Sequence, residues 1–348
     1  MKTAAKALIA TLVLAVVATP ILAQQRRGGG ERLPQECRAE IVQLCGSDRS
    51  PMRSCLVERA SALSDGCRAA LLARFEARRG AGGGQQQGPA PQQTLAYGSD
   101  PLQALDLWVP QGATKAPLVL FVHGGGWKRG SKSNAMSRAL PGHMLAEGYA
   151  FASIDYRLVP AATVEQQAGD VAAALAFLLK RAESLGIDRS RVVLTGHSAG
   201  AHLVALVGTD ERYLRAAGLS FADIDGVMPN DGAAYDVASQ FTMAGPRMKA
   251  TYEQAFATDP ARQAALSPMR QAAAPNAPAF LLLHVQRRDA VDQSKRLAEA
   301  LKTGGTAVEV AGFPGDGLRG HMEINRKLGE PDYPATAVMD AWLKTVLR

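Results

Sequence analysis

Cysteine is absent from most of this chain. All four cysteines of the 348 residues lie between positions 37 and 67, and none follows. No two of them have the CxxC spacing, so the sequence does not favour a structural metal site. Long hydrophobic runs are also missing after residue 23, where charges and glycines interrupt the apolar segments, and no membrane span is expected there.

The chain also has few aromatic residues and little excess charge in its main part. Aromatic residues make up 5% of the sequence, and no basic stripe carries interleaved aromatics, so nucleic-acid binding is not expected. The formal net charge is +7, to which two lysines in residues 1–23 contribute +2. Eleven arginines against seven Asp and Glu give residues 24–95 a charge of +4, which leaves +1 for residues 96–348. Basicity thus belongs to the N-terminal part, which can attract anionic surfaces.

Residues 1–23 have the pattern of a secretory signal peptide. Lys2 and Lys6 precede the apolar run Ala7–Val17, and the segment ends on the small residue Ala23. The run is too short to span a bilayer, which takes about 20 apolar residues. We therefore expect cleavage after Ala23 and export to the periplasm or out of the cell.

Residues 24–79 are predicted to form a small cysteine-rich helical module. In an exported protein, an even set of cysteines within about 30 residues indicates disulfide bonds. Three pairings are possible, and two antiparallel helices favour the nested one, Cys37 with Cys67 and Cys45 with Cys55. Disulfides would stabilise a unit that buries too little apolar surface to be stable alone.

Two sequence segments in this module resemble the short cysteine-rich repeats of Golgi-type sialoglycoproteins. They are Ser54-Cys55-Leu56 and Leu63-Ser64-Asp65-Gly66-Cys67. We expect such a module to contact a cell-envelope polymer or a protein partner. Residues 80–95, which are uncharged and rich in Gly, Gln and Pro, are predicted to be a flexible linker to the rest of the chain.

From residue 96 onward, strand-like apolar segments alternate with helical ones. Strands are predicted at 104–109, 118–122, 150–154, 192–194, 224–228, 280–283 and 307–310, with helices at 134–147, 164–181, after 198, at 293–301 and towards 347. This alternation predicts a mostly parallel sheet with helices on both faces. Residues 237–270 contain no long strand and are expected to form a small lid.

The segment Gly196-His197-Ser198-Ala199-Gly200 sets a serine between two glycines directly after a predicted strand. At a sharp strand-to-helix turn, a Cβ two residues before or after the serine would collide with the crossing chain. The turn also places the hydroxyl at the start of the next helix, whose dipole favours negative charge. We interpret Ser198 as a nucleophile. The alternative is a tight glycine turn in an ordinary strand–helix unit.

A second glycine motif, His123-Gly124-Gly125-Gly126-Trp127, follows the strand at 118–122. Its uncovered backbone N–H groups can bind the oxyanion of a tetrahedral intermediate, together with the N–H of Ala199. We expect Gly125 and Gly126 to supply them, with Gly124 as the further candidate. The alternative, a phosphate-binding loop, lacks the following Lys-Ser/Thr of the Walker motif.

Chain order selects the two partners of the serine, because in this arrangement the acid and then the histidine follow it. Asp289 and Asp292 both come after the strand at 280–283, and Asp292 has the position of a helix N-cap, so Asp289 is the predicted acid. Of the six histidines, His321 is the one in a predicted loop after the last strand. The predicted triad is Ser198, Asp289 and His321, with neither metal nor cofactor.

These motifs resemble those of the α/β-hydrolase superfamily and, more narrowly, those of the hormone-sensitive-lipase-like esterases. The resemblance covers about residues 96–348 and is carried by the two glycine motifs and by Asp155-Tyr156-Arg157. It implies an eight-stranded sheet, no cofactor, and a structural role for residues 155–157 in bracing the glycine loop. The segment His284-Val285-Gln286-Arg287-Arg288 differs from the His-Gly-x-x-Asp motif common in this superfamily.

Three other sequence segments are most similar to those of the bacterial feruloyl-esterase-like and arylformamidase-like members. They are residues 231–236, Asp289 followed by Gln293-Ser294, and His321 followed by Ile324-Asn325-Arg326. The resemblance implies an exported esterase that cleaves small or aromatic acyl esters, small-molecule substrates, through an acyl-enzyme. Arylformamidase and polysaccharide deacetylase activities would use the same triad. A non-catalytic binding protein with a hydrolase fold is the alternative from a different class.

Overall fold

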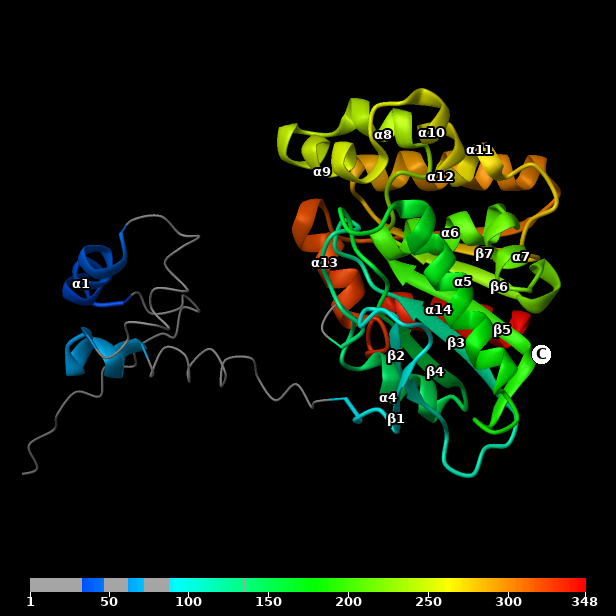
Figure 1. Ribbon diagram of the computed structural model, residues 1–348, viewed down its shortest axis with the longest axis horizontal. Coiled ribbons are helices and arrows are strands. Elements are labelled where there is room, and N and C mark those ends of the chain that lie inside the picture. The colour runs from blue at the N-terminus through cyan, green and yellow to red at the C-terminus, as the bar shows by residue number, and fades with distance from the viewer. Residues whose placement is uncertain (1–32, 47–61, 72–87, 134–135) are drawn as a thin grey trace, which may run out of the picture. The chain divides into compact units, whose positions relative to one another are not determined.

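The chain divides into two compact units, Met1–Gly84 and Gln85–Arg348. The computed structural model describes residues 33–46, 62–71, 88–133 and 136–348 (Figure 1). The predicted signal peptide, residues 1–23, lies outside these described residues. None of the helices in the described ranges is both long and apolar enough to cross a bilayer.

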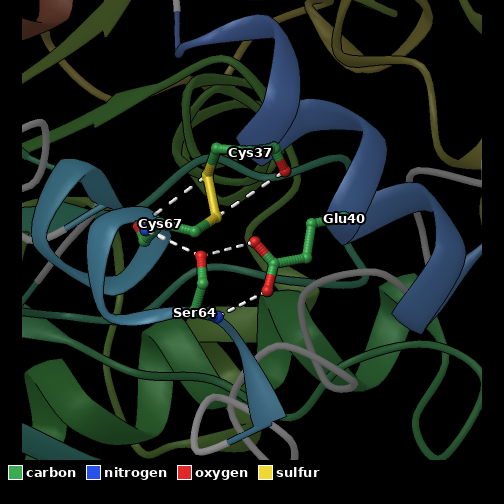
Figure 2. Close-up of a disulfide and its surroundings, with 4 residues drawn as sticks. All are labelled: Cys37, Glu40, Ser64 and Cys67. Carbon is green, nitrogen blue, oxygen red and sulfur yellow. Dashed lines mark hydrogen bonds between the residues drawn. A yellow bond between two sulfur atoms is a disulfide. The ribbon is translucent and has the colours of Figure 1, made fainter.

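The N-terminal unit contains helix α1 (Gln35–Cys45) and a second helical segment at residues 65–71. A disulfide joins Cys37 to Cys67, as the nested pairing predicts (Figure 2). The carboxylate of Glu40 accepts hydrogen bonds from the backbone N–H of Ser64 and, at 2.7 Å, from its hydroxyl. The other predicted bond, Cys45–Cys55, involves a residue outside the described ranges and stays a prediction.

The second unit is built on one sheet with the strand order β1-β2-β4-β3-β5-β6-β7-β8. Its strands are β1 Gln93–Ala96, β2 Ala104–Trp108, β3 Ala116–Val122, β4 Ala150–Ile154, β5 Ile187–His197, β6 Gly226–Asn230, β7 Ala279–Val285 and β8 Ala307–Phe313. β2 runs antiparallel to both of its neighbours, and all other pairs are parallel. The predicted eight-stranded, mostly parallel α/β-hydrolase sheet is confirmed.

Helices cover both faces of this sheet (Figure 1). One apolar core packs under α5 (Val164–Lys180), α6 (Ala199–Thr209) and α12 (Arg288–Thr303). The other packs under α4 (Leu140–Ala146), α13 (Gly317–Lys327) and α14 (Pro334–Val346). Every residue of β3 is buried, as its continuous apolar run predicts for a strand covered on both faces.

The sheet begins earlier than the sequence predicts. β1 begins within the predicted linker, residues 80–95, and pairs with β2. The side-chain amide of Gln92 bonds to the backbone N–H and C=O of Val109, and the indole N–H of Trp108 donates to the carbonyl of Pro89 at 2.8 Å. A four-residue edge strand is too short to show a period-2 pattern, so its polar residues suggested a linker.

Short helices fill the predicted lid region between β6 and β7: α8 (Val237–Met243), α9 (Pro246–Phe256), α10 (Pro260–Ala265) and α11 (Pro268–Gln271). They follow α7 (Arg212–Ala216) and β6 along the chain and gather in one group (Figure 1). Tyr252 and Phe256 are buried against the indole of Trp127, with ring centroids 5.9 and 4.7 Å from it. These two aromatics are therefore core residues, whereas Met248 is exposed.

Candidate active site

Ser198 occupies the sharp turn between β5 and α6, with φ +57° and ψ −116°. A side chain with this backbone conformation is strained, and such strain persists only where the surroundings enforce it. A Cβ built at Gly196 would lie 2.6 Å from the carbonyl group of Gly200. One built at Gly200 would lie 2.0 Å from the carbonyl oxygen of Val122. The steric reason predicted for the two flanking glycines is confirmed.

This crowding predicts that Gly200→Ala destabilises the protein. The added methyl group would force β3 and α6 apart, and we expect the free energy of unfolding to fall by at least about 2 kcal/mol in urea titrations. Gly169→Ala is the matched control, since Gly169 lies in α5 and a Cβ there meets nothing within 4 Å. It should leave stability equal or raise it by up to about 1 kcal/mol. Equal effects of the two substitutions would contradict the steric argument.

The structure brings His321 to Ser198. The imidazole Nε2 lies 3.0 Å from the Ser198 Oγ, and Nδ1 lies 2.6 Å from a carboxylate oxygen of Asp231. The carboxylate accepts from Nδ1–H, so Nε2 is free to accept the serine proton. His321 lies in the second turn of α13, whereas the sequence suggested a loop.

Asp231 directly follows β6 and has a fully buried carboxylate. One carboxylate oxygen accepts from the backbone N–H of Val285 at 3.0 Å, and the other accepts from His321 and from Arg287 Nε at 3.0 Å. Burial alone would raise the pKa of this carboxyl, but the hydrogen bond from His321 and the charge of Arg287 lower it overall. Asp231 is therefore a carboxylate poised to stabilise a positively charged imidazole.

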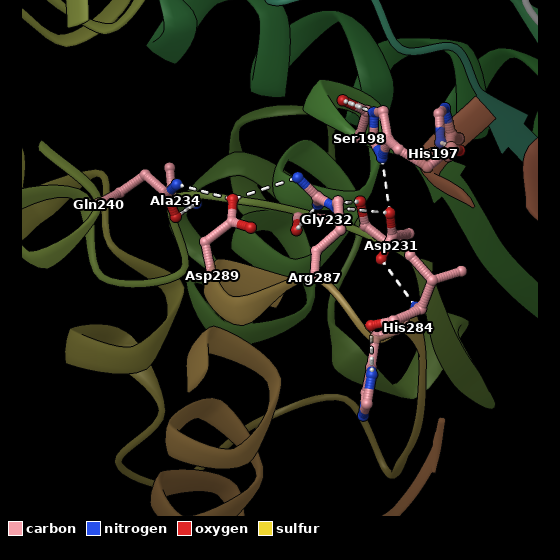
Figure 3. Close-up of polar contacts among 11 residues, drawn as sticks. His197, Ser198, Asp231, Gly232, Ala234, Gln240, His284, Arg287 and Asp289 are labelled. Atoms are coloured by element: carbon pink, nitrogen blue, oxygen red, sulfur yellow. Dashed lines mark hydrogen bonds and ion pairs between the residues drawn. The ribbon is translucent and has the colours of Figure 1, made fainter. Parts of the chain in front are cut away.

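The prediction of Asp289 as the partner of His321 is corrected by the structure. Asp289 lies in the first turn of α12, where it pairs with Arg287 at 3.2 Å and accepts from the side chain of Gln240 at 3.1 Å (Figure 3). The reason is that only two residues separate the end of β7 from the start of α12 at Arg288, so Asp289 already lies in the helix. The N-cap proposed for Asp292 is wrong for the same reason.

Asp231 has a sequence signal that could have identified it. It follows the apolar strand predicted at 224–228 within three residues, and a position soon after a strand is what selected Asp289 as well. Its φ of +45° is one that Asp tolerates better than most residues. The sequence analysis placed the acid after the strand at 280–283, so Asp231, which follows the preceding strand, was not selected.

The glycine loop is held open in a conformation that needs glycine. Gly125 and Gly126 have φ values of +127° and +63°. Within the described ranges, no residue accepts a hydrogen bond from the backbone N–H of Gly125, Gly126 or Ala199. The loop is anchored next to them by the side chain of Gln167, which donates to the carbonyl of Trp127 at 2.7 Å. Uncommitted donors on a fixed loop suit the binding of a developing oxyanion.

Residues 155–157 brace this loop, as the resemblance implies. The Asp155 carboxylate accepts from the backbone N–H of Lys132 at 2.7 Å. The Tyr156 ring stacks on His123 at 4.2 Å, and its hydroxyl donates to the His123 carbonyl. Arg157 forms a forked ion pair with the buried Asp170. These acidic groups are structural and do not reach the serine.

One set of His and Asp groups in the described ranges lies close enough to hold a metal ion: His197, Asp231 and His321. Its facing atoms already have partners, since His197 Nε2 lies 3.0 Å from the His321 carbonyl and Asp231 binds His321. Arg287 adds a positive charge to the same carboxylate. Burial, and then the neighbouring His321, lower the pKa of His197 well below its usual range. The set is suited to proton transfer rather than to holding a cation.

Known proteins are similar to this chain in sequence or in fold. A family model, BD-FAE, matches residues 105–301. Esterase LipC of Mycobacterium tuberculosis is 38% identical over 116 residues, which are 33% of this chain and 28% of LipC. A probable isoprenylcysteine alpha-carbonyl methylesterase of Oryza sativa is 40% identical over 114 residues, 32% of this chain and 26% of that protein.

Two further similar proteins are a formamidase and an esterase of known structure. Kynurenine formamidase of Drosophila melanogaster is 36% identical over 114 residues, 32% of this chain and 36% of that protein. The chain thus spans little more than a third, at most, of the length of these three relatives. The crystal structure of esterase B from Lactobacillus rhamnosis superposes with a TM-score of 0.62 at 23% identity, covering 84% of this chain and 94% of that one. That likeness supports the fold.

Proposed function

The chain belongs to the BD-FAE family and is a serine-hydrolase-type esterase, and from this premise we propose that it cleaves carboxylic esters through Ser198, His321 and Asp231. The observation that carries the proposal is the continuous contact from serine to imidazole to carboxylate, at 3.0 and 2.6 Å. Both distances lie within hydrogen-bond reach, which is what proton transfer requires.

In the proposed mechanism, His321 Nε2 removes the Ser198 proton while Oγ attacks the acyl carbon. Asp231 keeps the imidazole in the productive tautomer and stabilises its charged form. The N–H groups of Gly125, Gly126 and Ala199 would bind the oxyanion. The protonated imidazole then gives its proton to the leaving alcohol, and an acyl-enzyme forms on Oγ. Water activated by His321 releases the acid by the reverse sequence.

We propose small or aromatic acyl esters as substrates, with aryl formamides as the second candidate because of the likeness to a kynurenine formamidase. The test is kcat/KM for p-nitrophenyl acetate, butyrate and decanoate, a feruloyl ester, an acetylated polysaccharide and N-formylkynurenine. We expect the acetate, butyrate or feruloyl ester to be the best substrate. A preference for N-formylkynurenine would establish the second candidate, and a preference for decanoate or for the polysaccharide would contradict the substrate class.

We also propose that the protein is exported and that the N-terminal unit contacts the cell envelope. The signal-peptide pattern of residues 1–23 supports export, and so does the Cys37–Cys67 disulfide, because such bonds persist in oxidising compartments. N-terminal sequencing of the protein recovered outside the cytoplasm should begin at Gln24. A cytoplasmic protein that retains Met1 or Lys2 would contradict the proposal.

A further inference from the structure

Arg287 lies between two carboxylates at the end of β7. Its Nε donates to the Asp231 carboxylate at 3.0 Å, and its terminal nitrogen reaches the Asp289 carboxylate at 3.2 Å (Figure 3). The Arg287 side chain is 15% exposed, so water screens its charge only weakly. Asp289 is held in turn by Gln240, whose side-chain oxygen accepts from the backbone N–H of Ala234 at 3.2 Å.

Two donors determine how the Asp231 carboxylate is oriented. The backbone N–H of Val285 holds one of its oxygens, and Arg287 shares the other with His321. Arg287 therefore restricts rotation of the carboxylate and keeps a lone pair directed at the imidazole. A cation in this place also has a cost, because it disfavours the positively charged imidazole that proton abstraction creates.

Asp289 compensates for that cost. Asp231, Arg287 and Asp289 together carry a charge of −1, which is the charge of a single carboxylate. We propose that Arg287 is a positioning residue for Asp231, and that Asp289 is its counter-ion, so that the three groups together control the pH range in which His321 accepts the serine proton. The inference rests on the proposed function. It gives Asp289 an indirect role in the site where the sequence placed it directly.

Other ionisable groups near this set do not supply the charge. They are His197 at the end of β5, Tyr235 after β6, Tyr252 on α9 and Tyr333 before α14. Burial lowers the pKa of His197 and raises that of Tyr235, and it raises those of Tyr252 and Tyr333 to about 12, so all four are neutral near pH 7. The ring of His284 on β7 points toward Gly312 and away from Asp231 (Figure 3).

The test measures how kcat/KM for a p-nitrophenyl ester depends on pH in the full chain and in variants that lack the charge of Arg287, of Asp289 or of both. The readout is the acid limb, the pH range in which activity is lost as His321 becomes protonated. Arg287→Gln removes the cation, so protonation of the imidazole becomes easier and the acid limb should move up by about half a pH unit or more. Asp289→Asn leaves the cation uncompensated and should move the limb down by a similar amount. The double variant restores the charge of −1 and should return the limb close to that of the wild type.

Two further variants separate charge from geometry. Arg287→Lys keeps the cation but loses the planar fork, so it should leave the acid limb in place and lower kcat about tenfold. Asp292→Asn is the control. The substitution removes the same charge from α12, but the Asp292 side chain is exposed and pairs with Arg296. It should leave the profile unchanged.

The outcomes distinguish the inference from the function. Acid limbs that coincide in the wild type and all Arg287 and Asp289 variants, with only the melting temperature reduced, would overturn the inference and leave the esterase intact. Shifts in the same direction for Arg287→Gln and Asp289→Asn would also overturn it. A wild-type protein that hydrolyses no ester and takes up no fluorophosphonate at Ser198 would instead overturn the proposed function.

Discussion

Asp231→Asn should lower kcat/KM for an activated ester by about 10³- to 10⁴-fold. An amide in place of the carboxylate can present an N–H to His321 Nδ1. This favours the imidazole tautomer protonated on Nε2, and in that tautomer Nε2 cannot accept the Ser198 proton. The charged imidazole also loses the carboxylate that stabilises it. The measurement is steady-state hydrolysis of p-nitrophenyl butyrate, with circular dichroism to verify that the variant is folded.

Asp289→Asn is the matched comparison for this variant. It makes the same carboxylate-to-amide change at Asp289, the acid that chain order favours, but the Asp289 carboxylate contacts Arg287 and Gln240 and not the imidazole. We expect its kcat/KM at the pH optimum to fall by less than about tenfold. If Asp289→Asn proved as damaging as Asp231→Asn in a folded protein, the acid would have to be reassigned to Asp289.

Ser198→Ala should abolish both hydrolysis and covalent labelling. Removing the nucleophile of a serine hydrolase costs about 10⁴- to 10⁶-fold in kcat, and the activity that remains comes from the oxyanion donors and substrate binding. Alanine keeps the Cβ and the backbone strain at φ +57°, so the fold should persist with a similar melting temperature. The readout is a fluorophosphonate probe detected on a gel, together with ester hydrolysis.

Ser190→Ala is the control for labelling, because Ser190 is exposed and its hydroxyl donates to the Asp188 carboxylate, away from the site. It should label as strongly as the wild type. Labelling that persists in Ser198→Ala, at a site located by peptide mass spectrometry, would reject Ser198 as the nucleophile.

The two predictions probe parts of the site that differ in origin. The serine lies in a turn whose shape depends on neighbours within four residues and on one crossing strand. The acid depends on how β6, β7 and α12 pack together. A helix that began a few residues later would leave Asp289 in a loop, as expected from chain order, and Arg287 would no longer lie between the two carboxylates.

Local chemistry was enough to predict several features from the sequence. The alternation of apolar and helical segments predicted the sheet and its covering helices. The glycines around Ser198 were predicted from a steric limit that acts over a few residues, and the loop at Gly125 and Gly126 from consecutive glycines that leave backbone N–H groups uncovered. His321 was selected because it is the one histidine that follows the last strand in chain order. The Cys37–Cys67 pair was favoured among three because two short helices bring those ends together.

Tertiary structure decided the rest. Which carboxylate meets His321 depends on where α12 begins and on Arg287, which draws Asp289 away from the imidazole and holds Asp231 against it. The start of the sheet at β1 depends on an edge strand that pairs with β2 and whose Thr94 hydroxyl donates to the Asp106 carboxylate on β2 at 2.7 Å. Such choices are made by contacts between residues tens of positions apart, and a pattern read over short windows does not contain them.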